Sequence, residues 1–135
     1  MMISDLDFEE RLKSARTTFL SPLSFPCCVK AKMDELDLSI KAFAEKARLS
    51  ETTIRRVLRS GDRHRDYSYD LIIRVALVLR IDPVALDYFV GMAGRCFNKV
   101  SLGYPLYYLN AYDMDLSDAL DWLEQLEAKG LLPKD

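Results

Sequence analysis

The sequence is poor in the residues that mark fibrous, disulfide-rich and metal-binding proteins. Its 135 residues include five glycines and five prolines, too few for a fibrous or low-complexity chain. There are three cysteines without CxxC spacing and a single histidine, His64. Because a zinc site usually needs four cysteine or histidine ligands at short spacing, we expect no metal site. The odd number of cysteines favours reduced thiols and hence a cytoplasmic protein.

A long hydrophobic run is also missing. The most apolar stretch, Leu71 to Leu79, is interrupted by Arg74 and is far shorter than the ~20 residues that span a bilayer. The first residues lack the basic and apolar regions of a secretory leader. We therefore expect a protein with neither a membrane segment nor a leader.

No pattern of catalytic residues is present. The sequence contains no HExxH motif, no glycine-rich phosphate loop and no pair of acids on an apolar segment. A cysteine–histidine pair would have to use His64, which lies in the polar, basic stretch GDRHRDY. We expect no enzymatic activity and no cofactor.

The charge is distributed unevenly. Lysine and arginine number 19 and aspartate and glutamate 21, so the net charge is −2. Residues 41–65 hold eight basic and three acidic residues, a net of +5, and the remainder of the chain therefore sums to −7. Residues 110–135 alone hold seven acids and two lysines. This distribution predicts one surface that meets an anion and another that does not.

The apolar pattern and the capping signals predict an all-α fold. Half of the residues are hydrophobic, and no run alternates as a strand would. Ser39, Ser50 and Ser68 stand where helices should begin, Pro83 suits a first helical turn, and Gly130 suits a helix stop. The expected helices cover residues 5–21, 29–37, 40–47, 51–59, 68–80, 84–91 and 118–129. Between them, 94–105 is expected to be less regular.

The same signals divide the chain into three segments. Residues 1–28 are expected to form a helix and a linker, because Pro22 and Pro26 disfavour a helix there. Residues 29–92 hold the basic helices. Residues 93–135 are expected to form a helical C-terminal extension.

The most informative stretch is IKAFAEKARLSETTIRRVLR, residues 40–59. Ala44 is small enough for two short helices to meet at a sharp angle, and Leu49 would fill the space at their turn. Ile54 and Val57, three residues apart, would face inward from the second helix. The outward side then carries short polar residues at the helix start and arginines further along. That arrangement suits a helix lying in the major groove of DNA.

Two runs extend this pattern, LSIKAFAEKARLSETTIRRVLRSG and YDLIIRVALVLRIDPVALDYF. Together they resemble the Cro/C1-type helix-turn-helix domain, the XRE family of phage repressors and bacterial regulators, over residues 30–90. The resemblance implies a compact five-helix bundle, within an all-α chain, and a double-stranded DNA target. Two positions depart from the family. Arg48 stands where the turn usually has glycine, which would require a left-handed backbone, and Arg59 stands where glutamate is common.

The outward side of residues 51–59, together with the resemblance, predicts the DNA contacts. The base-reading candidates are Glu51, Thr52, Thr53, Arg55 and Arg56. The phosphate-contacting candidates are Lys41, Ser50, Arg59, Arg63 and Arg65. Glu51 either accepts a hydrogen bond from a cytosine amino group or stabilises the helix start. Arg63 and Arg65 either contact phosphate or are solvated loop residues.

The C-terminal third has two interpretations. One such domain reads only a few base pairs, so we expect a homodimer on two half-sites. The stripe of the last helix is then the first candidate for the dimer or partner surface. It comprises Leu116, Leu120, Trp122, Leu123 and Leu126. Alternatively, the chain is an antitoxin or another protein-interaction module, which keeps the scaffold and binds a protein through its acidic C-terminal third.

Overall fold

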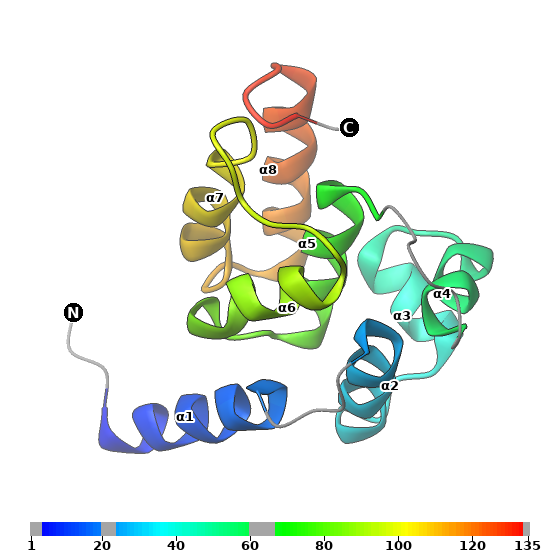
Figure 1. Ribbon diagram of the computed structural model, residues 1–135, viewed down its shortest axis with the longest axis vertical. Coiled ribbons are helices and arrows are strands. Elements are labelled where there is room, and N and C mark those ends of the chain that lie inside the picture. Colours follow the sequence, from blue (N-terminus) through cyan, green and yellow to red (C-terminus); the bar gives the residue numbers. More distant parts are fainter. Residues whose placement is uncertain (1–3, 20–23, 60–66, 134–135) are drawn as a thin grey trace.

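The computed structural model describes residues 4–19, 24–59 and 67–133 (Figure 1). These residues form eight α-helices and one 3-10 helix, η1, and no strand occurs among them. In chain order the elements are α1 (Asp5–Phe19), α2 (Phe25–Glu35), α3 (Ile40–Ala47), α4 (Glu51–Leu58), α5 (Tyr69–Leu79), η1 (Pro83–Ala85), α6 (Leu86–Met92), α7 (Gly103–Ala111) and α8 (Leu116–Ala128). The predicted all-α class is confirmed for this part of the chain.

Helices α3, α4 and α5 begin where the sequence predicted, each after a serine. The hydroxyls of Ser39, Ser50 and Ser68 accept the backbone N–H three residues further along, each at 3.1 Å. Helices α3 and α5 both end at an arginine in the left-handed conformation, Arg48 and Arg80. Because non-glycine residues seldom adopt this conformation, each turn carries some backbone strain.

Helix α2 begins earlier than the sequence predicted. We expected the stretch before Val29 to be a poor helix, but α2 starts at Phe25. Pro26 lies in the first turn, where a backbone N–H is not needed. Ser24 accepts the N–H of Cys27 at 3.2 Å and so caps the helix. The predicted boundary between linker and domain after residue 28 therefore falls inside α2.

Helix α5 is the centre of the core. Ten of its eleven residues are buried, and it packs against α2, α3, α6, α7 and α8. Arg74, the one basic residue of α5, is buried with them. Its guanidinium binds Asp70 at 3.0 Å, Glu124 of α8 at 3.5 Å and the carbonyl of Ala47 in α3 at 3.2 Å. Arg74 therefore ties three helices together inside the molecule.

The C-terminal helices α7 and α8 pack on the same core as α2 to α5. One hydrophobic cluster extends from Phe25 to Leu132. Two buried tyrosines of α7, Tyr107 and Tyr108, donate their hydroxyls to the backbone carbonyls of Ala119 and Ile81 at 2.6 Å and 2.5 Å. Burial raises the pKa of both tyrosines well above its ordinary value. The region predicted as an extension is thus part of the same core, and α8 packs directly against α3.

Helix α1 lies along η1 at one edge of the molecule (Figure 1). Arg11 donates two hydrogen bonds, at 2.6 Å and 3.2 Å, to the carboxylate of Asp82. The hydrogen bond to Asp82 raises the pKa of Arg11 above its ordinary value. Lys32 of α2 also reaches α1, with its Nζ 3.2 Å from the carbonyl of Ser14. Two polar links therefore hold α1 to the body of the protein.

None of the helices in the described ranges is long and apolar enough to cross a membrane. The three cysteines are free thiols, with Cys27 and Cys96 exposed and Cys28 buried. Among the residues that the structure describes, no group of three or more histidine, cysteine, aspartate or glutamate side chains could hold a metal ion.

Candidate nucleic-acid interface

Helix α4 buries one side and presents a polar face to solvent. Ile54 and Val57 point into the core, as their spacing predicted. Thr53 is half-buried at the border between the two sides. The exposed side chains are those of Glu51, Thr52, Arg55 and Arg56. Four of the five predicted base-reading residues are therefore accessible to a ligand.

The first turn of α4 is held by a small polar network. The hydroxyl of Ser50 accepts the N–H of Thr53 and lies 2.8 Å from the hydroxyl of Thr53. Both side chains are thus engaged with each other. Thr53, predicted as a base reader, helps to stabilise the start of α4 in this structure. Ser50, predicted as a phosphate contact, is exposed at the N-terminus of α4, the end of a helix that favours anions.

Glu51 and Arg55 form an ion pair along the exposed face of α4. Arg55 Nη2 lies 3.3 Å from a carboxylate oxygen of Glu51, one helical turn away. Such a pair on a helix surface contributes only about 0.3–0.5 kcal/mol. Arg55 can therefore exchange this carboxylate for a base edge or a phosphate at little cost. Glu51, predicted either to accept from cytosine or to stabilise the helix start, lies in the first turn of α4 and pairs with Arg55 here.

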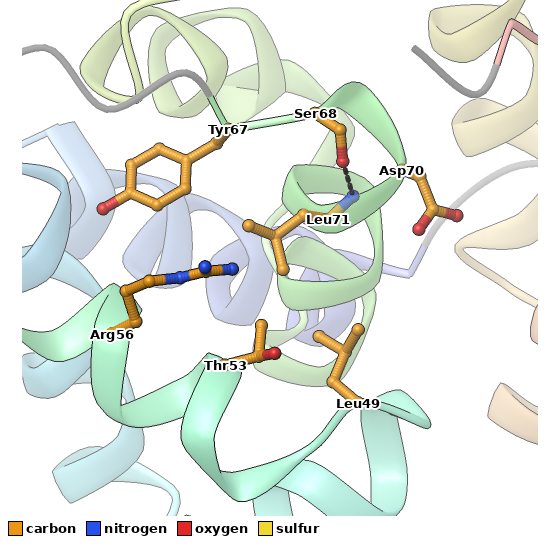
Figure 2. A pocket seen from close by; sticks show the side chains of 7 residues that line it. All are labelled: Leu49, Thr53, Arg56, Tyr67, Ser68, Asp70 and Leu71. Atoms are coloured by element: carbon orange, nitrogen blue, oxygen red, sulfur yellow. Dashed lines mark hydrogen bonds between the residues drawn. The ribbon is translucent and has the colours of Figure 1, made fainter.

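A hollow of about 440 Å³ separates α4 from the start of α5 (Figure 2). Arg56 and Thr53 line it from α4, and Tyr67 and Leu71 line the opposite side. Figure 2 shows the Arg56 side chain reaching from α4 toward Leu71 beneath the ring of Tyr67. Arg56 makes no ion pair with any residue in the described ranges. Its guanidinium is thus an available cation at the edge of the polar face nearest α5.

The predicted phosphate contacts are only partly covered by the structure. Lys41 is exposed in the first turn of α3, and Arg59 is exposed at the end of α4. Arg63 and Arg65 lie outside the described residues, as does His64. Lys41 lies in the first turn of α3 and Arg59 directly follows α4, so both are accessible positive charges on the α3–α4 pair.

Arg48, at the turn between α3 and α4, is directed to α8. Its backbone is left-handed, with φ 57° and ψ 43°, as the departure from the family pattern required. Its guanidinium lies 2.9 Å from Asp121 and 3.0 Å from Glu124, and it also donates to Ser117. The hydrogen bond to Asp121 is the main cause of the raised pKa of Arg48. Arg48 therefore belongs to the basic block of the sequence but is neutralised by the acids of α8.

We expect Arg48→Gly to be more stable than Arg48→Ala by about 1 kcal/mol, because glycine adopts the left-handed conformation without strain. Both substitutions remove the ion pairs with α8, so their difference isolates the backbone contribution. The free energy of unfolding from urea titrations measures it. Equal stabilities, or a more stable alanine variant, would show that the turn is not strained at this position.

The stripe of α8 predicted as a dimer or partner surface is used within the subunit. Leu120 and Leu123 are buried in the core. Leu116, Trp122 and Leu126 are half-buried and pack against the same core, with the Trp122 and Tyr107 ring centroids 5.0 Å apart. In this fold the stripe is thus not an open face, because α8 packs against α3, α5 and α7. The acids Asp121 and Glu124 likewise pair with Arg48, so part of the charge of the acidic C-terminal third is neutralised within the subunit.

The structure shows a row of exposed leucines on α7 that was not predicted from the sequence. The segment 94–105 was expected to be irregular, and no helix was predicted between 94 and 117. The spacing of Leu102, Leu106 and Leu109, four and three residues apart, was a signal for one side of a helix. This spacing was not recognised as a helix signal, because the tyrosines on the opposite side of α7 make the segment apolar on both sides.

No family model, no curated protein and no solved structure matches this chain. The case for the site therefore depends on its geometry. A short helix, capped by Ser50 and held by Ile54 and Val57, presents threonine and arginine side chains to solvent.

Proposed function

We propose that this chain is a sequence-specific, double-stranded DNA-binding transcriptional regulator of bacterial or phage type, with a Cro/C1-type helix-turn-helix. Helix α4 would enter the major groove. The observation that carries the proposal is the division of α4 into two sides. Ile54 and Val57 anchor one side in the core, and Thr52, Arg55 and Arg56 stand exposed on the other.

The local geometry supports a recognition helix. Helix α4 is only eight residues long, and its packing against α2 and α3 fixes its position on the body of the protein. The turn from α3 is made tight by the left-handed Arg48, and Ala44 is buried there. A rigid short helix that stands on the surface can meet base edges with its N-terminal half, as in helix-turn-helix proteins.

The exposed side chains have the chemistry that base edges require. Arginine can donate two hydrogen bonds to O6 and N7 of guanine, and threonine can contact either a polar base atom or the thymine methyl group. In this proposal Arg55, Arg56 and Thr52 read bases. Lys41 and Arg59 would contact phosphates on either side and set the register on the duplex. The first N–H groups of α3 would add a phosphate contact.

The net charge of −2 does not oppose this assignment, because several of the acids pair with arginines outside α4. Asp121 and Glu124 neutralise Arg48, and Asp70 and Glu124 neutralise Arg74, so these arginines are not offered to DNA. The side chains left on α4 carry a net positive charge. We place the regulator in the cytoplasm, where free thiols such as those of this chain persist.

Selection from a pool of random duplexes tests the proposal. The purified protein is incubated with the pool at low salt, and bound duplexes are recovered, amplified and sequenced. We expect a short motif to be enriched, with two copies about one helical turn apart if the protein binds as a dimer. The Arg55→Ala, Arg56→Ala double variant is the matched control and should enrich nothing in common. Absence of any enriched motif with the wild-type protein would contradict the proposal.

A further inference from the structure

Helix α7 carries leucines on its exposed side. Leu102, which precedes the helix, and Leu106 and Leu109 are 65%, 67% and 62% exposed. Their spacing of four and three residues places them on one side of the helix, and we name these three residues the α7 leucine face. Leucines exposed singly are normal in a protein surface, whereas a row of three is not.

The opposite side of α7 is buried. Tyr104, Tyr107 and Tyr108 are almost inaccessible there and pack in the core. The helix is thus apolar on both sides, and the sequence from Val100 to Tyr112 contains no charged residue, although 30% of the whole chain is charged. A helix that is hydrophobic all round is normally covered all round. In the single subunit the side of this helix that carries Leu106 and Leu109 is left uncovered.

The surface next to the α7 leucine face is hollowed. A hollow of about 300 Å³ between α7 and α8 is lined mostly by apolar side chains, among them Leu106, Trp122, Leu126 and Leu131. Leu131 is itself 64% exposed, so the apolar surface continues beyond α7. Projecting leucines and an apolar hollow therefore lie side by side. A surface with both features can be complementary to itself.

We propose that a second copy of this chain covers the α7 leucine face, in a two-fold symmetric dimer whose axis passes near Leu106. In an antiparallel pair of α7 helices, Leu102 of one copy faces Leu109 of the other, and Leu106 faces its own equivalent. At the axis of an isologous contact each residue meets its own equivalent, so like charges there would repel, and the segment from Val100 to Tyr112 carries no charge. A partner of a different kind that binds by charge would find nothing to pair with here.

The position of α7 is compatible with the proposed DNA contact. Helix α7 packs against α5, α8 and η1, and Figure 1 shows it on the side of the molecule away from α4. Pairing through α7 therefore leaves the polar face of both α4 helices open. The inference deepens the dimer that the proposed function uses, but it does not depend on DNA binding and is tested without DNA.

Sedimentation velocity over a concentration series tests the dimer. We expect the wild-type protein to be a dimer and the Leu106→Glu, Leu109→Glu double variant to be a monomer. Burying two carboxylates in an apolar contact should raise the dimer dissociation constant more than about 100-fold. Because both leucines are exposed in the subunit, far-UV circular dichroism and the melting temperature of the monomer should be preserved. A wild-type monomer, or a double variant that still dimerises, would overturn the proposal.

Leu6→Glu is the matched control. Leu6 lies on α1 and is 67% exposed, the same as Leu106. We expect the Leu6→Glu variant to dimerise like the wild type, and loss of its dimer would move the interface to α1.

A complementation experiment tests the two-fold axis. Leu106→Glu and Leu106→Lys should each be monomeric, and an equimolar mixture should form a 1:1 heterodimer, because the opposite charges meet at the axis. If both single variants are folded monomers and the mixture stays monomeric, Leu106 does not lie at a two-fold contact and the proposed geometry is wrong.

Discussion

Replacing Arg74 by alanine should lower the free energy of unfolding by about 3–5 kcal/mol, because it breaks a buried ion-pair network from one side. The Arg74 side chain is only 7% exposed. It holds Asp70 at 3.0 Å and Glu124 at 3.5 Å, with the carboxylate of Glu127 at 4.0 Å. The Glu127 side chain is 4% exposed, so the substitution also removes a cation from beside a carboxylate that water cannot easily reach.

The structure offers a matched control for this prediction. Arg55 and Glu51 form an ion pair with the same one-turn spacing as Arg74 and Asp70, but on the surface. Arg55→Ala should change the free energy of unfolding by less than about 0.5 kcal/mol. Urea titrations of both variants and the wild type give the comparison. A loss below about 1 kcal/mol for Arg74→Ala would show that the Arg74 ion pairs contribute little to holding α8 against α3 and α5.

The second large effect is expected on DNA affinity. Arg56→Ala should weaken binding to the preferred duplex by about 1–3 kcal/mol, or about 5- to 150-fold, if the guanidinium donates two hydrogen bonds to a guanine. Binding to an unrelated duplex should change much less, because that binding depends on phosphates. The affinities are measured by fluorescence anisotropy. Equal affinity of variant and wild type for the preferred duplex would remove Arg56 from the base-reading residues.

Two further variants separate base reading from charge. Lys41→Ala should weaken binding to both duplexes to a similar degree and reduce the slope of log K against log salt by about 1, as expected for one lost phosphate contact. Arg48→Ala removes the same charge as Arg56→Ala, but from a side chain that is paired with Asp121 and Glu124. It should leave the affinity for the preferred duplex nearly unchanged.

The sequence predicted the starts of α3, α4 and α5 well because the signals for a helix start are local. A capping serine acts on an N–H three residues away, so Ser39, Ser50 and Ser68 mark their helices without any knowledge of the fold. The spacing of Ile54 and Val57 likewise identifies the buried side of α4 from the helical period alone. The exposed side of the candidate site follows from the same period.

The C-terminal part could not be predicted in this way, since its structure depends on distant contacts. The helical period correctly identified an apolar stripe on α8. It could not indicate whether Leu120 and Leu123 are covered by the same subunit or by a partner. The pairing of Arg48 with Asp121 joins residues 73 positions apart and leaves no local signal. Helix α7 was not predicted because its two sides carry tyrosines and leucines, which are both largely apolar. The segment therefore lacks the difference in polarity between two sides that marks an amphipathic helix.

Helix α2 shows a third kind of error. Two prolines close together suggested a break, but a proline in the first turn of a helix costs nothing in hydrogen bonding. The deciding residue was Ser24, whose hydroxyl caps the helix from just before Phe25.

The most direct test of DNA recognition is fluorescence anisotropy of the purified protein on two labelled duplexes, the motif selected from the random pool and its scrambled version, across a salt series. The proposal predicts much tighter binding to the selected duplex at physiological salt, with log K falling linearly as log salt rises. Equal and weak binding to both duplexes, lost by physiological salt, would contradict it and would make the polar face of α4 an ordinary solvated surface.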